Sequence, residues 1–201
     1  MADRVLIYGV TGTGKTTLAA RLSERTGVPW HSVDDLTWEP GWTEVPLDIQ
    51  RKRISEICAA ERWILDTAYG KWLDIPLARV QLIVALDYPR WVSLGRLIWR
   101  TFRRLVDRNE ICNGNTESLG QAFSRDSIIV WHFRSFARKR ARIRAWAASG
   151  PDRHPTASSG PDRHPAAPSG PGRHPTASPP AAPEVVRLTS PRSARRWLET
   201  L

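Results

Sequence analysis

The feature that most constrains this chain is the octapeptide GVTGTGKT, Gly9 to Thr16, which fits the pattern G-x-x-x-x-G-K-[ST] in full. The apolar run DRVLIYG leads into it, and a helix is predicted to follow over Lys15–Thr26, with Gly27 as its C-terminal cap. Glycines in such a loop let successive backbone N–H groups turn inward around a phosphate, at the positive end of the helix dipole. A strand, this loop and a helix in that order predict a phosphate-binding loop.

The chemistry of the loop predicts a nucleoside triphosphate as its ligand. Lys15 adds a point charge toward the β- and γ-phosphates, and the Thr16 hydroxyl can bind Mg²⁺. The guanine-selecting sequence N-K-x-D of GTPases is absent, so we expect ATP with Mg²⁺. The residues expected to bind the nucleotide are Gly9, Thr11, Gly12, Thr13, Gly14, Lys15, Thr16 and Thr17.

Apolar runs alternate with helical patterns along the rest of the chain. VPWHSV, RWILD, RVQLIVALD and PEVVRLT are predicted as strands, each bounded by a turn or a helix. Ser190 is expected to cap a last helix, whose inner face carries Ala194, Trp197, Leu198 and Leu201. Strands that alternate with helices form a parallel sheet covered on both faces, so the predicted fold class is α/β.

The length of 201 residues, with 41% of them hydrophobic, favours a single domain. Within residues 149–183 a ten-residue unit occurs three times, as SGPDRHPTAS, SGPDRHPAAP and SGPGRHPTAS. Its Pro, Gly, Ser and Ala residues offer almost nothing to a core, so we predict a disordered insertion inside the domain. We attribute the recurring His154, His164 and His174 to repeat expansion and not to metal binding.

The formal net charge of +10 predicts an anionic partner. Between Arg90 and Arg144, thirteen Lys or Arg stand against four acids, so this segment carries a net +9. No apolar run approaches the roughly 20 residues of a membrane span, and the run before the loop is unlike a secretory signal. We therefore expect a cytoplasmic protein with no membrane partner.

Several motifs agree in order and spacing with one family. After the loop these are V-D-D-L-x-W-x-P-G-W, W-I-L-D-x-x-Y, L-D-Y-P-R-W and the closing strand and helix. The chain thereby resembles the small adenylate-kinase-like proteins labelled DNA topology modulation proteins, over nearly all of its length except the repeats. The resemblance implies a P-loop sheet like that of nucleoside monophosphate kinases and an arginine-rich helical lid over about residues 90–147. It also implies transfer of the ATP γ-phosphate to a small molecule such as a nucleotide or nucleoside.

The resemblance gives roles to two carboxylates and a tyrosine. Asp66, at the end of a predicted strand, is expected on the Mg²⁺ side of the site, with a strand-end cap as the alternative. Asp34 is expected to bind or deprotonate an acceptor hydroxyl, and Tyr69 to lie in the same substrate site. Where the family has Gly-Asn before this tyrosine, the chain has Thr67 and Ala68, which changes the expected acceptor contacts.

Two tryptophans flank a predicted Pro-Gly turn near Asp34. The rings of Trp38 and Trp42 are expected to line the acceptor pocket, as a flat wall for a base or sugar. The alternative is that they only hold the loop against the core.

The helix predicted after LDYP carries Arg96, Arg100 and Arg103 on one face. By resemblance, Arg96 and Arg100 clamp the transferring phosphoryl group, where bidentate guanidinium groups neutralise developing charge. The apolar residues of this helix are expected to face the protein; they are Trp91, Leu94, Ile98, Phe102 and Leu105.

A second basic helix follows. Arg134 and Arg138 are expected to meet the first pair across the lid, with residues 107–121 as its tip. The alternative is a solvated basic face. The neighbouring basic run is predicted to be solvated surface; it consists of Lys139, Arg140, Arg142 and Arg144.

Two functions stay open on the sequence. One is an ATP-dependent phosphotransferase with a small-molecule acceptor. The other is an ATP-binding protein that acts on or binds DNA, because a basic helix would serve nucleic-acid phosphates equally well. The sequence contains no helix-turn-helix, zinc-finger or RNA-binding signature, which favours phosphotransfer. It names neither the acceptor nor the oligomeric state.

Overall fold

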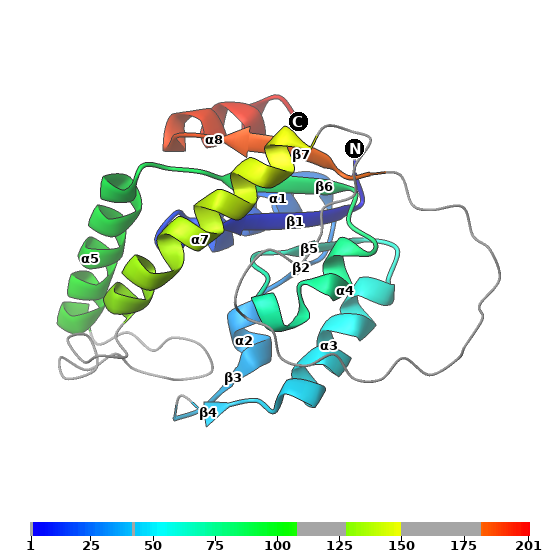
Figure 1. Cartoon of the computed structure of the whole chain (residues 1–201), viewed down its shortest axis with the longest axis horizontal. Helices are drawn as coiled ribbons and strands as arrows, with labels where there is room; N and C mark the ends of the chain where they lie inside the picture. The colour runs from blue at the N-terminus through cyan, green and yellow to red at the C-terminus, as the bar shows by residue number, and fades with distance from the viewer. Residues whose placement is uncertain (1, 42, 108–127, 150–181) are drawn as a thin grey trace.

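The computed structural model describes residues 2–41, 43–107, 128–149 and 182–201. Its centre is a sheet of five parallel strands in the order β2-β5-β1-β6-β7. Helices cover both faces of this sheet, so the predicted α/β fold class is confirmed (Figure 1). The strands are β1 (Arg4–Gly9), β2 (Trp30–His31), β5 (Trp63–Leu65), β6 (Leu82–Leu86) and β7 (Glu184–Leu188).

The central strands are almost wholly apolar because both faces of the sheet are covered. Every residue of β5 and β6 is buried, as is every residue of β1 after Arg4. β2 is shorter than VPWHSV predicted, since a short helix, α2 (Val33–Thr37), starts directly after Ser32. β7 pairs in parallel with β6, with Val186 opposite Val84, so the last strand completes one edge of the sheet.

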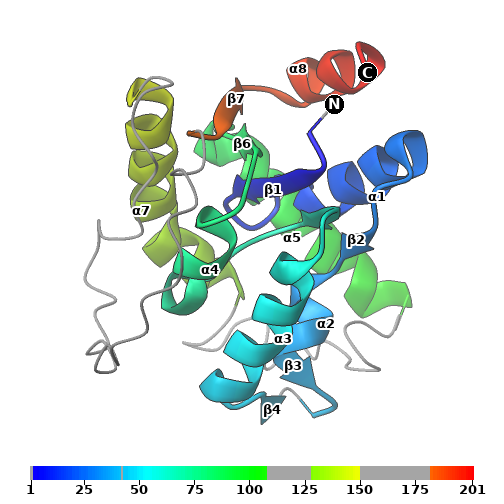
Figure 2. The same cartoon turned by 90° about the vertical axis from the view of Figure 1, so that its right-hand side faces the viewer.

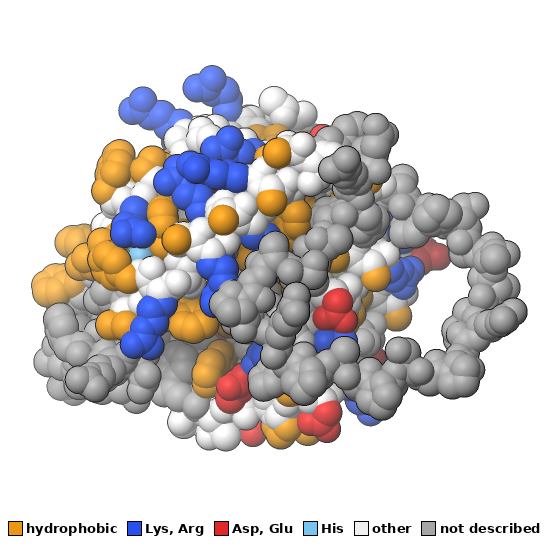
Figure 3. Space-filling model, viewed as in Figure 1, with side chains coloured by type: hydrophobic (Ala, Val, Ile, Leu, Met, Phe, Trp, Pro, Cys, Tyr) orange, Lys and Arg blue, Asp and Glu red, His pale blue; other side chains and the backbone are white. Residues whose placement is uncertain are grey.

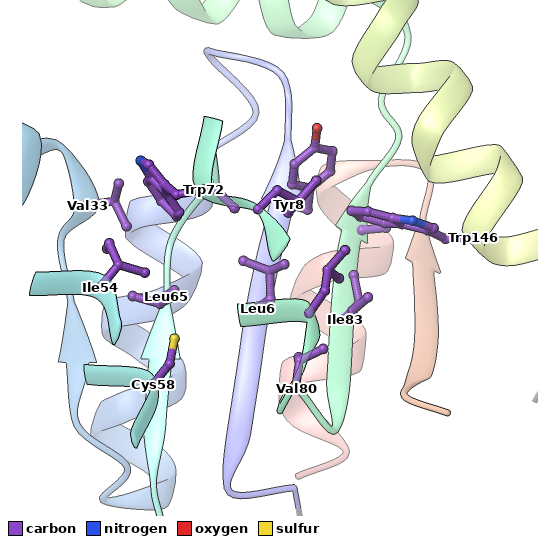
Figure 4. Packing of buried hydrophobic residues seen from close by; sticks show 14 of the residues in the cluster. Leu6, Tyr8, Val33, Ile54, Cys58, Leu65, Trp72, Val80, Ile83 and Trp146 are labelled. Carbon is purple, nitrogen blue, oxygen red and sulfur yellow. The ribbon is translucent and has the colours of Figure 1, made fainter. Parts of the chain in front are cut away.

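Two layers of helices enclose the sheet. One layer consists of α3 (Leu47–Ala59), α4 (Asp74–Leu77) and α7 (Ile128–Ala148), and the other of α1 (Lys15–Thr26) and α8 (Pro191–Glu199) (Figures 1 and 2). In the first layer the Trp146 ring of α7 lies 4.9 Å from the Tyr8 ring of β1 (Figure 4). This packing fixes α7 across the strand that leads into the phosphate-binding motif.

The helix ends largely follow the sequence. α1 has the predicted bounds, and Gly27 after it adopts a left-handed φ of +66°. The Ser190 hydroxyl caps α8 as predicted. Ala194 and Leu198 are buried on the inner face of α8. Leu201 follows the helix and is exposed, so its predicted burial is wrong.

The stretch after α2 forms a hairpin of β3 (Trp38–Glu39) and β4 (Thr43–Glu44). Trp42, the ten-residue repeats and residues 108–121 of the expected lid tip lie outside the described residues. The helix α5 (Arg90–Asp107) precedes that gap. No helix in the described ranges has the length and apolar character needed to cross a membrane.

Candidate active site

The loop between β1 and α1 is held by its own backbone and by α5. Gly12 and Gly14 adopt left-handed φ values of +84° and +88°, and α1 starts directly after Gly14. The buried Thr13 hydroxyl donates a hydrogen bond to the Val10 carbonyl at 2.8 Å. A Cβ on Gly12 would lie 2.3 Å from the Ser93 carbonyl of α5, so only glycine fits where the helix packs on the loop.

Lys15 projects back over this loop. Its Nζ donates to the Val10 carbonyl at 3.0 Å. Burial lowers the pKa of Lys15, the charges of Asp34 and Asp66 raise it, and the charge of Arg100 lowers it again. The ammonium group therefore lies among charged side chains at the mouth of the loop. Of the other residues expected to bind the nucleotide, Thr11 is half-buried, and Thr16 and Thr17 are exposed in the first turn of α1.

Thr16 and Asp66 bring two side-chain oxygens together beside the loop. The Thr16 hydroxyl donates to Asp66 Oδ2 at 2.8 Å, and the backbone N–H of Val33 donates to Asp66 Oδ1 at 3.0 Å. Burial raises the pKa of Asp66, while these two hydrogen bonds and Lys15 lower it. A hydroxyl and a carboxylate at this separation suit Mg²⁺, which prefers oxygen ligands and retains phosphate and water oxygens. No group of three or more metal-binding His, Cys, Asp or Glu side chains occurs among the described residues, so phosphate and water would complete the coordination.

A second carboxylate lies close to the first. Asp34 is exposed in the first turn of α2, and the Tyr69 hydroxyl donates to its Oδ1 at 2.7 Å. Burial raises the pKa of Tyr69, the Asp34 charge adds to this, and hydrogen bonding with Trp38 opposes it. The structure thus brings three of the four expected acceptor-site residues together. Trp42 lies outside the described residues, and Thr67 and Ala68 are buried.

Of the predicted arginines, Arg96 and Arg100 on α5 lie at the loop. Arg96 Nη1 donates to the Thr13 carbonyl at 3.4 Å, and Arg100 is near enough for its charge to lower the pKa of Lys15. On α7, Arg134 is exposed and Arg138 is half-buried, with its guanidinium 5.9 Å from the Trp131 ring. The structure therefore places Arg96 and Arg100 beside the phosphate-binding loop, whereas Arg134 is exposed on α7.

Three of the five residues of the predicted apolar face of α5 do not face the protein, while Leu94 is half-buried and the side chain of Leu105 lies outside the described part of the structure. Trp91 is 77% exposed, and Ile98 and Phe102 are also exposed. The inward stripe is instead Ser93, Leu97 and Thr101, and α5 approaches Gly12 closely at Ser93 and Leu97. Hydrophobic side chains accordingly gather on the surface at the left of Figure 3. The predicted orientation of these three residues is wrong.

The basic run on α7 is not simply solvated surface. Lys139 and Arg142 are buried, with exposed fractions of 7% and 5%. Lys139 Nζ donates to the Gly9 carbonyl at 3.4 Å and lies 5.7 Å from the centre of the Tyr8 ring. Arg142 Nη1 donates to the Tyr8 hydroxyl at 3.1 Å. That part of the prediction is wrong because it ignored the helical spacing of Lys139 relative to Trp146, seven residues on, which α7 buries against the sheet.

Asp87, after β6, is the centre of a group of charges that we call the Asp87 cluster: Asp87, Arg140, Arg144 and Arg187. Asp87 is 3% exposed. Its Oδ1 accepts from Arg140 Nε at 2.8 Å, and its Oδ2 accepts from Arg187 Nη2 at 2.5 Å, with Arg144 Nε 3.8 Å away. This cluster joins α7 to β7, so Arg140 has a structural partner that the sequence did not reveal.

The sheet, its loop and the helix after it define a P-loop α/β protein. No protein-family model matches the chain, and no curated protein sequence matches it. Among solved structures, it is similar to a gluconokinase from Sinorhizobium meliloti 1021, with 14% identity and a TM-score of 0.47, over 98% of this chain and 92% of that one. A putative kinase from Chloroflexus aurantiacus has 12% identity and a TM-score of 0.47, over 100% and 97%. Shikimate kinase from Aquifex aeolicus has 19% identity and a TM-score of 0.39, over 57% and 87%. These similarities are distant, so function is argued below from side chains.

Proposed function

We propose that this protein is an ATP-dependent phosphotransferase that acts on a hydroxyl group of a small molecule. The observation that carries the proposal is the convergence of three features at one edge of the sheet. They are Lys15 over the P-loop, the Thr16–Asp66 pair beside it, and Asp34 with Tyr69 close by. A phosphate site, a magnesium site and a carboxylate next to them are what phosphoryl transfer requires.

The residues divide the chemistry among themselves. The P-loop and Lys15 bind the phosphates of ATP, and Thr16 and Asp66 would hold Mg²⁺, which neutralises phosphate charge when bound. Asp34 accepts the proton of the acceptor hydroxyl, whose oxygen forms the new bond to the γ-phosphorus. The bond between that phosphorus and the oxygen bridging to the β-phosphate breaks, and ADP leaves. Arg96 and Arg100 stabilise the charge on the transferred group.

The side chains around Asp34 indicate which class of acceptor the site would bind. A carboxylate with a tyrosine and the half-buried Trp38 suits a polar molecule with a flat or ring-shaped face, such as a nucleoside, nucleotide or sugar. We further propose that residues 1–201 form one domain, with the region of about 90–147 as its lid and the repeats as an insertion.

The test is ADP formation by the pure protein with Mg-ATP and a panel of nucleoside monophosphates, nucleosides and sugars. We expect ADP to form only when one acceptor is present. Asp34→Asn, which removes the base but keeps the size, should abolish most of that stimulation, while the surface control Asp35→Asn should not. ATP turnover that no acceptor stimulates would contradict the proposal.

The alternative is an ATP-binding protein that binds DNA, in line with the resemblance to DNA topology modulation proteins. It is favoured by the lysine and arginine side chains that gather where α7 crosses the sheet (Figure 3). In a plot of the logarithm of the DNA-binding constant against the logarithm of salt concentration, the slope would become shallower by about one unit for each phosphate contact removed. Tight retention of duplex DNA at physiological salt, without acceptor-stimulated ATP use, would favour this alternative.

A further inference from the structure

Lys139 is a buried cation with few partners. Its side chain extends from α7 to the end of β1, where Nζ reaches the Gly9 carbonyl at 3.4 Å. Within the described ranges, no carboxylate forms an ion pair with it. Burying an ammonium group without a counter-charge is costly, and one long hydrogen bond to a carbonyl compensates little of that cost.

Lys139 and Lys15 donate hydrogen bonds to the carbonyl groups of neighbouring residues. Lys15 donates to the carbonyl of Val10, and Lys139 donates to the carbonyl of the preceding residue, Gly9. The two ammonium groups therefore converge on the start of the P-loop from different helices, α1 and α7. A site with two lysines at one loop is strongly favourable for a polyanion and unfavourable without one.

We propose that Lys139 is a second phosphate-binding lysine of this site, which binds the phosphate chain of the nucleotide together with Lys15. The inference rests on the proposed nucleotide binding and extends it to a residue outside the P-loop motif. Because α7 carries Lys139, nucleotide binding is thereby tied to the position of α7 on the sheet.

The charges around Lys139 make this binding sensitive to pH. Burial, together with the charges of Lys15, Arg138 and Arg142, lowers the pKa of Lys139 to about 7, although the charge of Asp34 opposes the shift. The Tyr8 ring of β1 also faces the ammonium group. A bound phosphate chain favours the charged form, so binding above neutral pH draws a proton onto Lys139.

The experiment is calorimetric titration of the full chain with Mg-ATP at pH 8, in two buffers of different ionisation enthalpy. For a pKa of about 7 we expect the wild-type protein to take up about 0.9 proton on binding. Lys139→Met should bind at least tenfold more weakly with little uptake. Lys139→Arg should bind within a few-fold of wild type but also with little uptake, because arginine stays charged. Lys52→Met, on the exposed surface of α3, is the matched control and should behave as wild type.

Thermal unfolding without nucleotide separates binding from structure. Lys139→Met should melt no lower than wild type, since methionine replaces a buried amino group whose charged form is disfavoured by burial. Unchanged affinity and proton uptake in Lys139→Met would overturn the inference and leave the phosphotransferase proposal intact. A lower melting temperature together with weaker binding would also overturn it, because Lys139 would then be structural. If wild type binds no Mg-ATP, the proposed function itself fails.

Discussion

Lys139 and Arg140 are consecutive on α7, yet they serve two different regions of the molecule. Arg140 enters the Asp87 cluster, where a buried carboxylate is hydrogen-bonded by arginines from α7 and β7. Lys139 belongs to a second region that we call the P-loop mouth, which consists of Lys15, Lys139, Arg96 and Arg100. In the first region buried charge is paired and joins elements of the fold. In the second, among the described residues, the basic side chains outnumber the nearby carboxylates Asp34 and Asp66, and such an excess of positive charge favours binding of an anion.

The comparison predicts that charge removal should have opposite consequences in the two regions. At the P-loop mouth it should weaken ligand binding without lowering stability. In the Asp87 cluster it should lower stability and leave ligand binding unchanged.

The largest effect is expected from Lys15→Ala. The side chain lies over the loop and not in the core, so the free energy of unfolding should stay within about 0.5 kcal/mol of wild type. Mg-ATP affinity should fall at least a hundredfold, about 2.7 kcal/mol. Calorimetric titration and urea unfolding measure the two quantities. Equal Mg-ATP affinity in the variant and the wild type would contradict the claim that the P-loop mouth binds the phosphates of the nucleotide.

The opposite pattern is expected from Asp87→Asn. Removing one partner of a buried ion pair costs about 3–5 kcal/mol, and we expect about 2–3 here because the arginines are partly exposed. Urea unfolding should show this loss, with Mg-ATP affinity within threefold of wild type. The matched control is Asp74→Asn, in an exposed pair with Arg51, which should cost less than about 1 kcal/mol. Similar losses in the two variants would mean that the Asp87 cluster is not a special stabilising contact.

A smaller effect on the P-loop side is expected from Arg100→Lys. This change keeps the charge and removes the planar guanidinium group, so acceptor-dependent ADP formation should fall about tenfold, or about 1.4 kcal/mol in barrier. Arg195→Lys, on the exposed surface of α8, is the control. Full turnover by Arg100→Lys would show that only the summed charge of α5 matters.

The smallest effect is a pH dependence of stability. The pKa of Lys139 is lowered to about 7 in the folded protein, so the unfolded chain binds the extra proton between about pH 7 and 10.5. Stability of the nucleotide-free wild type should therefore rise with pH in this window. The advantage of Lys139→Met over wild type should shrink by about 1 kcal/mol between pH 7 and 8, as measured by urea unfolding at both pH values. An advantage that grows with pH would contradict this assignment.

The strands and the P-loop could be predicted because their signals are local. An apolar run before a glycine motif dictates β1 and the loop, and helical spacing with Gly27 dictates α1. The Ser190 cap and the burial of Leu198 follow from the same kind of pattern.

The surroundings of the site could not be predicted because they depend on which face of a helix meets the sheet. On α5 the large apolar side chains suggested an inward face, but Ser93 and Leu97 are the residues that lie beside Gly12. On α7 the spacing of Lys139 to Trp146 was a usable signal, although nothing in the sequence says that α7 crosses β1 at Gly9. The partners of Asp87 come from segments about 50 and 100 residues away, so no local pattern could have revealed them.

The central claim is that the P-loop mouth is a nucleotide phosphate site, and one calorimetric titration of the wild-type full chain with Mg-ATP tests it most directly. The account predicts saturable binding with one nucleotide per chain, weakened by added salt because the contacts are ionic. A titration with no saturable heat and no rise in melting temperature at millimolar Mg-ATP would contradict it.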